Sequence, residues 1–214
     1  MAQTIDREDF VRMIRAAAAK INAEHEMLSR LDAATGDGDH GTTMKRAMAN
    51  AEKAIAESPG AGLGDLLQNI AWAVMGTDGG ATGPLFGTFF MGLSEGLGAA
   101  TVLDAPAVAK AFEAGLAAIQ KQTPAKVGDK TMLDALIPAV EALRAAANEQ
   151  DLAAVLARGA EAAEKGAAAT KDLRARHGRA RNLGDRSIGS QDPGATSVGL
   201  MFRGFAEALA AKKA

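Results

Sequence analysis

The spacing of apolar residues constrains the fold of this chain more than any other feature. From Leu63 to Val74, apolar side chains recur every three or four residues, which is the period of one face of an α-helix. Other segments show the same period. Tyrosine is absent, aromatic residues make up 4% of the chain, and alanine and leucine dominate. Because these residues favour helix over strand, we predict an all-α protein with about eight helices.

The predicted helices are separated by glycine-bearing or polar segments. They cover about 6–29, 43–57, 63–74, 86–97, 105–120, 133–143, 151–170 and 195–211. Pro138 lies inside the sixth pattern and should kink that helix or mark its true start. From 171 to 194 the helical period is lost, so we expect this segment to lack regular structure.

Four polar loops follow the odd-numbered helices of this series: the acidic loop 36–41, then 76–84, 123–131 and 171–194. Helices joined by short loops alternate in direction, so loops that follow odd-numbered helices share one end of a bundle. No tandem repeat or low-complexity linker divides the chain. We therefore predict one domain over 1–214, an antiparallel bundle or barrel whose polar loops meet at a single mouth.

Three carboxylates lie close together in the first of these segments. Asp32, Asp37 and Asp39 fall within eight residues, and the glycines between them allow a tight turn. Each acid alone could be an ordinary turn residue. Three that converge need a cation, and Mg²⁺ commonly binds between a few carboxylates and substrate phosphates. Thr42 and Thr43 follow at a helix start, where free N–H groups favour an anion. We predict a metal and a phosphate together.

Three nucleotide or calcium motifs match only in part. Gly36-x-Gly38-x-x-Gly41 has the dinucleotide-binding spacing, but that motif needs a preceding strand. An EF-hand that starts at Asp37 would have Met48 in place of its bidentate glutamate. The segment 128–131 resembles the end of a P-loop but lacks the upstream glycine. None of these motifs is expected to form.

The composition of the chain argues against several classes of protein. The net charge of −2 argues against a nucleic-acid binder, and the absence of cysteine excludes thiolate metal sites. No apolar run reaches membrane-spanning length, and the N-terminus lacks the layout of a signal peptide, so we expect a soluble cytoplasmic protein with no membrane partner.

The roles of the three histidines and of a basic cluster stay open. His40 is either a surface histidine of the loop or a phosphate contact, whereas His25 and His177 are expected to be structural or solvated. A basic cluster in 171–186 leaves another class open, a helical nucleic-acid or protein-interaction module. One arginine there could instead neutralise phosphate.

Four blocks in order, 32–43, 79–90, 128–132 and 183–195, resemble the nucleotide-binding L subunit family of dihydroxyacetone kinases. That family is an antiparallel eight-helix barrel with the nucleotide at one end. The resemblance implies that Asp32, Asp37 and Asp39 bind two Mg²⁺ ions that bridge the phosphates of ADP or ATP. It implies nucleotide contacts at His40, Gly41, Thr42, Thr43, Ala81, Thr82, Thr123, Met132, Arg179, Asp192, Pro193 and Gly194.

The resemblance also implies an activity and partners. Dihydroxyacetone would be held by a separate K subunit, and the L subunit would be active only with it. Thr42-Thr43 departs from the Leu-Asn of some members that receive their phosphoryl group from the phosphotransferase system. Two phosphoryl donors therefore stay open. Either ADP stays bound and is rephosphorylated by a phosphotransferase-system M subunit, or free ATP is the donor. A related ketose such as erythrulose could replace dihydroxyacetone.

Overall fold

A computed structural model of the protein describes residues 4–212. In this range the regular structure is helical apart from one isolated β-bridge between Ile5 and Leu103. The elements are α1 (Arg7–Ala33), α2 (His40–Glu57), α3 (Leu63–Met75), α4 (Thr82–Leu97), α5 (Ala105–Gln120), α6 (Leu133–Ala145), α7 (Leu152–Ala169), η1 (Thr170–Asp172), η2 (Arg179–Ser187) and α8 (Pro193–Ala211). The prediction of an all-α fold with about eight helices is confirmed.

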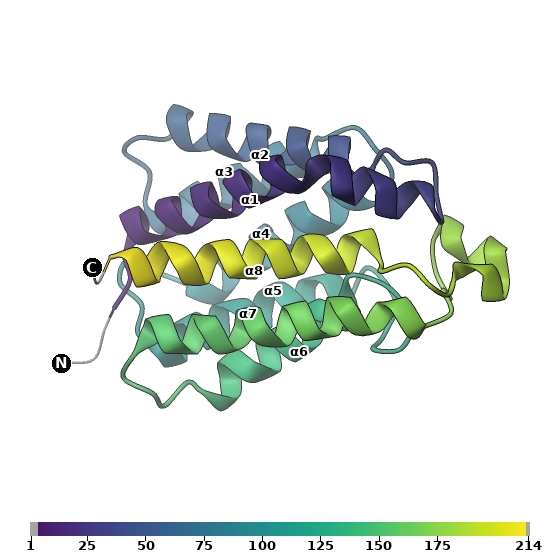
Figure 1. The fold of residues 1–214 in the computed structure, drawn as a ribbon. Helices are drawn as coiled ribbons and strands as arrows, with labels where there is room; N and C mark the ends of the chain where they lie inside the picture. Colours follow the sequence, from purple (N-terminus) through teal and green to yellow (C-terminus); the bar gives the residue numbers. More distant parts are fainter. Residues whose placement is uncertain (1–3, 213–214) are drawn as a thin grey trace.

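The eight α-helices form a closed barrel (Figure 1). Each helix from α1 to α8 packs on the next one in the chain, and α8 closes the ring by packing on α1. Close approach at this closure depends on Gly204 of α8. A Cβ added there would lie 2.6 Å from backbone atoms of Ala17 of α1, so only glycine lets these two helices lie so near each other.

Aromatic residues fill the centre of the barrel. Phe89 and Phe112 meet edge to face with ring centroids 5.8 Å apart, and Phe112 meets Phe202 in the same way at 5.4 Å. These rings come from α4, α5 and α8 and are almost completely buried. Edge-to-face pairs add stability beyond the burial of their area. The aromatic core therefore holds α4, α5 and α8 together. Polar side chains that could bind a ligand are left to the ends of the barrel.

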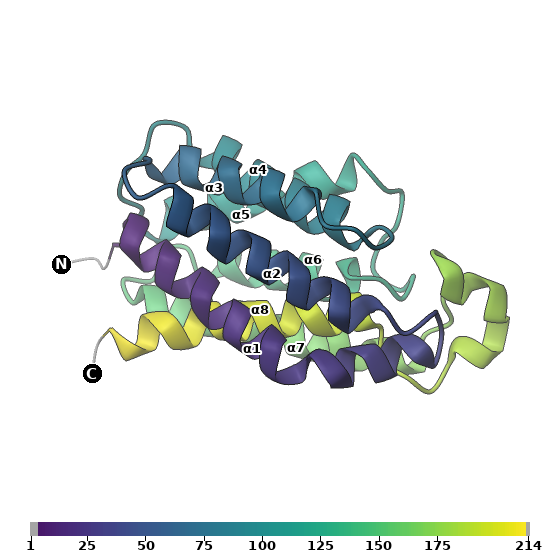
Figure 2. The ribbon, with the colours of Figure 1, turned by 90° about the horizontal axis from the view of Figure 1, so that it is seen from above.

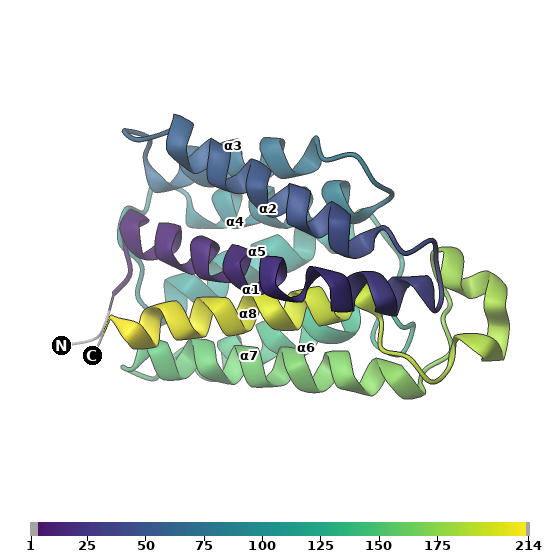
Figure 3. The same cartoon turned by 45° about the horizontal axis from the view of Figure 1, so that its top comes forward.

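One end of the barrel gathers the connections that the sequence predicted to meet. Figures 2 and 3 show the α1–α2, α3–α4, α5–α6 and α7–α8 connections at the same end, which we call the mouth. The other end, which we call the closed end, carries the start of α1 and the finish of α8. There the Nζ atom of Lys212 lies 2.8 Å from a carboxylate oxygen of buried Asp9. The prediction of a single mouth is confirmed.

Several predicted boundaries were wrong. The first helix continues past residue 29 to Ala33, and the second begins at His40 instead of residue 43. The fourth begins at Thr82, inside the predicted loop. Pro138 lies within α6 and does not mark its start, because the helix begins at Leu133. One added turn at a helix end contributes too few apolar positions to extend the period, so the period did not show these ends.

The segment 171–194 was expected to lack regular structure, and this was wrong. It contains η2, and its last residues begin α8. We call residues 171–191 the arch; in Figure 1 it projects beyond the mouth. Gly184 adopts φ 59° inside η2 and breaks it into two short pieces. A 3₁₀ helix this short has no sustained apolar period. Within residues 4–212, no helix combines the length and apolar character that a membrane crossing needs.

Candidate functional site

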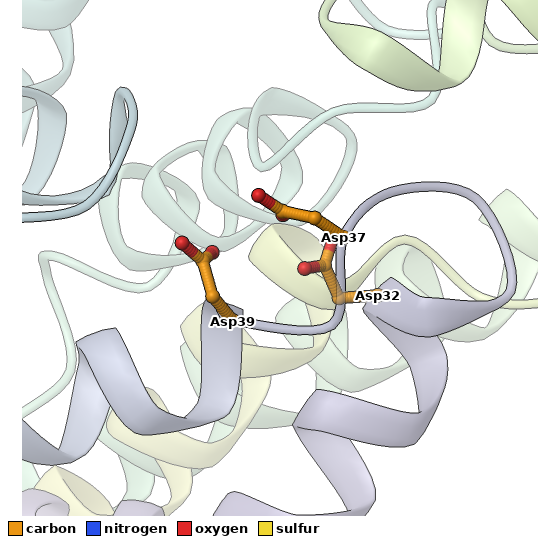
Figure 4. A group of neighbouring side chains, drawn as sticks. All are labelled: Asp32, Asp37 and Asp39. Carbon is orange, nitrogen blue, oxygen red and sulfur yellow. The ribbon is translucent and has the colours of Figure 1, made fainter.

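The three acids predicted to bind metal come together at the mouth. Asp32 lies in the last turn of α1, and Asp37 and Asp39 lie in the connection to α2. Figure 4 shows the three side chains turned toward one another, and one carboxylate oxygen from each lies within 4.8 Å of the others. Asp32 is partly buried and the other two are exposed. An all-carboxylate donor set that converges in this way suits a hard divalent cation such as Mg²⁺.

Glycines of this connection bring the acids together. Gly38 has φ 79°, a conformation that side chains disfavour, and lets the chain reverse between Asp37 and Asp39. A Cβ added at Gly36 would lie 2.5 Å from Oδ1 of Asp32. The Asp32 carboxylate therefore lies directly over the backbone of the turn, in space that only glycine leaves free.

A cation from the arch already contacts the acidic cluster. The guanidinium of Arg179, at the start of η2, forms an ion pair with Asp37. Arg179 was predicted to complete the site from a distant part of the sequence, and the structure brings it there. The pair offsets one of three neighbouring negative charges. The arch and the α1–α2 connection thus meet over the mouth.

His40 is a buried link between three helices, so the interpretation of it as a surface histidine was wrong. The residue is 8% exposed, with ring atom Nε2 2.9 Å from the hydroxyl of Ser197 on α8 and Nδ1 3.2 Å from the hydroxyl of Thr82 on α4. Its backbone N–H donates to a carboxylate oxygen of Asp32 at 3.2 Å. Burial lowers the pKa of His40 to about 4 even though Asp32 opposes this shift. The ring is therefore neutral at neutral pH.

The direction of these hydrogen bonds fixes the tautomer of His40. The hydroxyl of Ser197 donates to the carbonyl of Pro193 at 3.0 Å, so it accepts from Nε2–H. Nδ1 then has no proton and accepts from the hydroxyl of Thr82. His40 thus orients Thr82 at the start of α4, one of the residues predicted to contact phosphate.

The second glycine-rich loop, 76–81, is held by α2. Arg46 donates to the carbonyl of Asp78 at 2.9 Å, and Asn50 donates to the hydroxyl of Thr77 at 3.0 Å. Gly79 has φ 131° and passes so close to Thr43 that a Cβ there would lie 2.8 Å from the Thr43 methyl group. These contacts therefore hold the loop against α2 at the mouth.

Two helix N-termini at the mouth, those of α2 and α4, are open to an anion. α2 and α4 begin there without a hydrogen bond from the N-cap side chain. The other two helices that begin at the mouth have side-chain partners: the N–H of Leu133, the first residue of α6, donates to the hydroxyl of Thr131, and Asp192 caps α8. At the closed end, aspartates 6, 104 and 151 cap α1, α5 and α7, whereas α3 follows Gly62 and has no side-chain cap. Uncapped N–H groups and the positive ends of helix dipoles favour negative charge. The mouth thus has acids for a cation and backbone donors for a phosphate beside them.

The far wall of the mouth comes from α6 and α8. A Cβ built at Gly194 would lie 3.4 Å from the Cβ of Met132, so the starts of the two helices are in contact. Asp192 caps α8 by accepting from the N–H of Ala195 at 2.7 Å. Thr123 bonds only inside its own loop, where its hydroxyl accepts from the N–H of Ala125 at 3.2 Å. Among residues 4–212, no hydrogen bond joins Thr123 to the other predicted site residues.

Sequence reasoning missed several residues that support the site. Ser197, Arg46 and Asn50 hold predicted contacts in place, but their partners are distant in the sequence and gave no local signal. Asp134 accepts from the N–H groups of Gly128 and Thr131 at 2.6 and 2.7 Å. Its position three residues after Thr131 is a helix-capping signature that could have been recognised.

Comparison with known proteins decides the family. Residues 34–207 match the DAK2 domain. The chain belongs to the DAK2 domain family. It is 38% identical over 199 residues to the ADP-binding subunit DhaL of a PEP-dependent dihydroxyacetone kinase from Listeria innocua, covering 93% of this chain and 95% of that protein. It is 37% identical over 212 residues to the DhaL subunit of Escherichia coli, covering 98% and 100%.

Longer kinases match this chain over part of their own length. A D-erythrulose kinase from Mycolicibacterium smegmatis is 38% identical over 90% of this chain, which spans 34% of that protein. The crystal structure of the dihydroxyacetone kinase of C. freundii in complex with AMP-PNP and Mg²⁺ superposes with a TM-score of 0.71 at 29% identity. That match covers 91% of this chain and 33% of the solved chain. The resemblance drawn from four sequence blocks, and the membership of a kinase family, are confirmed.

Proposed function

We propose that this DAK2 protein is the ADP-binding subunit of a dihydroxyacetone kinase. It binds Mg–nucleotide at the mouth and supplies the phosphoryl group for dihydroxyacetone held on a separate K subunit. A phosphotransferase-system M subunit rephosphorylates the bound ADP. Two relatives named as ADP-binding subunits match over at least 95% of their own length, which supports a stand-alone subunit of the same kind.

The convergence of Asp32, Asp37 and Asp39 beside uncapped helix starts is the observation that carries the proposal. Two Mg²⁺ ions held by these carboxylates would neutralise charge that develops on the transferred phosphoryl group. The first turn of α2, with Gly41, Thr42 and Thr43, would contact the phosphates, as would Ala81 and Thr82 at the start of α4. Proximity of cation ligands and anion donors is what nucleotide binding requires.

The remaining predicted residues are assigned to the nucleoside and to charge neutralisation. Met132 and Thr123 would border the adenine, and Asp192, Pro193 and Gly194 would complete the pocket at the start of α8. Arg179 would turn from Asp37 to a phosphate once a metal ion shares that carboxylate. The arch then serves as the cationic side of the site.

Calorimetry of the purified chain with Mg²⁺ and ADP tests the proposal. We expect wild-type protein to bind, and Asp37→Asn to lose binding while its helical circular dichroism is unchanged. Asp65→Asn is the matched control, because Asp65 is an exposed acid in the first turn of α3 at the closed end. Equal nucleotide affinity in wild type and Asp37→Asn would contradict the proposal.

A second candidate is an ATP-dependent kinase for erythrulose or a related ketose. The 38% identity to a D-erythrulose kinase favours it, although this chain spans only a third of that protein. Adding ATP alone to this subunit and its K subunit separates the two candidates. Sustained turnover identifies ATP as the donor, whereas a single turnover identifies ADP as a bound cofactor that needs an M subunit.

A further inference from the structure

A buried lysine beside the mouth has no role in the site described above. Lys130 is 3% exposed and lies in the loop before α6. Its φ of 59° is the left-handed value, which Lys130 alone adopts among the non-glycine residues described by the structure. Holding a lysine in this conformation, and removing it from water, both cost free energy. Such a position needs compensating contacts.

Those contacts join the two ends of the arch. The Nζ atom of Lys130 donates to the carbonyl of Thr170 at 2.7 Å and to the carbonyl of Ser190 at 2.5 Å. The two carbonyls are twenty residues apart in the sequence, one just before the arch and one near its end. One ammonium group therefore closes the base of the arch. Hydrogen bonds from a charged donor are stronger than neutral ones.

Other bonds at the base depend on the same closure. The N–H of Gly189 donates to the carbonyl of Lys171 at 2.8 Å, and the N–H of Asp192 donates to the hydroxyl of Thr170 at 2.8 Å. Asp129, next to Lys130, binds the middle of the arch: its carbonyl accepts from the N–H of Arg176 at 3.1 Å. The loop 128–131 is thus the platform on which the arch rests.

We propose that Lys130 is a positioning residue that clamps the arch over the mouth and so retains the bound nucleotide. The clamp acts through two neighbours: Arg179, which the arch presents to Asp37, and Asp192, where the arch joins α8. This inference rests on the proposed function for its effect on nucleotide, whereas its effect on the arch does not.

Hydrogen exchange of the nucleotide-free protein tests the clamp. The variants are Lys130→Met, which keeps the side chain's length without its charge, and Lys130→Gly, which suits left-handed backbone. Lys126→Met, an exposed lysine of the same loop, is the control. We expect exchange in 171–191 to quicken about tenfold or more in both Lys130 variants, with α4 and α5 unchanged. If Lys130→Met does not fold, the glycine variant decides.

Dissociation of a fluorescent ADP analogue tests the effect on nucleotide. We expect release to quicken about tenfold in the Lys130 variants and to stay at the wild-type rate in Lys126→Met. Unchanged exchange in the arch, or exchange that rises equally in arch and barrel, would overturn the clamp. A loosened arch with wild-type ADP release would overturn its role in retention. If no protein binds ADP, wild type included, the proposed function fails while the exchange experiment still decides the clamp.

Discussion

The guanidinium of Arg179 rests on the carboxylate of Asp37, across the mouth of the barrel. Six α-helices, α2 to α7, and the short η1 lie between the two residues in the sequence, and their contact joins the arch to the acidic cluster. A cation from the chain thus lies where the proposed metal must also bind. A metal ion bound by Asp37 would therefore compete with the arginine for this carboxylate.

Arg179→Gln is expected to raise the affinity for Mn²⁺ in the absence of nucleotide by roughly two- to fivefold, the range for an exposed ion pair. Electron paramagnetic resonance of free Mn²⁺ measures this affinity. Arg181→Gln is the control, because Arg181 is exposed on the same arch and forms no ion pair within residues 4–212. Weaker Mn²⁺ binding by the Arg179 variant would show that the two cations do not compete.

Gly79→Ala is expected to weaken Mg–ADP binding about tenfold or more. Alanine at φ 131° is strained, and its methyl group would press on Thr43 and displace the loop from α2. Gly60→Ala is the matched control, because no atom lies within 4 Å of a Cβ added there and its φ is not positive. Calorimetry of both variants checks the prediction, and equal affinities for all three proteins would refute it.

Asp192→Asn is expected to change how stability depends on pH. Burial raises the pKa of Asp192 from 3.8 to about 7, with Asp134 adding to the shift and Lys130 opposing it. Between pH 4 and 7 the folded protein keeps a proton that the unfolded chain loses, so this group's contribution to the unfolding free energy falls as pH rises. Asparagine can still cap α8 but does not titrate.

Urea unfolding at pH 5, 6 and 7 measures this effect. We expect the difference in unfolding free energy, Asp192→Asn minus wild type, to increase at each step upward in pH. Parallel pH profiles for the two proteins would mean that Asp192 does not titrate in this window.

Asp9→Asn is expected to lower the unfolding free energy by about 1–3 kcal/mol without changing nucleotide affinity. Burial alone would raise the pKa of Asp9, but Lys212, the N–H of Asp6 and Arg12 hold it below its usual value. The stabilisation by the ionised Asp9 carboxylate is thus complete above about pH 4, the ordinary pKa of an aspartate. It is lost as the pH falls through the lower pKa that Asp9 has in the folded protein. Urea unfolding against the exposed control Glu8→Gln checks it, and unchanged stability would count against the buried pair.

The barrel could be predicted because each helix buries one apolar face, which the sequence records as a period. The acidic cluster could be predicted because its members are close in the sequence and glycines separate them. Two extended helix ends were missed: Asp32 belongs to α1, and His40 belongs to α2. The burial of His40 depends on Ser197, which is 157 residues away, so no local pattern reports it.

The burial of Lys130 could not be predicted from the sequence either. A lysine after Gly-Asp in a polar loop suggests a solvated charge, and only the fold brings the carbonyls of Thr170 and Ser190 to its ammonium group. The arch was missed for a related reason: its short helices are held by polar bonds to another loop, and such bonds leave no apolar period.

The nearness of the start of α1 to the finish of α8 has a practical consequence. α1 begins and α8 finishes at the closed end, where Lys212 reaches Asp9, while every element of the proposed site lies at the mouth. A peptide bridge from the finish of α8 to the start of α1, with a new break at the exposed turn of Pro59 and Gly60, would give a circular permutant with an untouched mouth. The order in which the helices are synthesised can therefore be changed independently of the site they build.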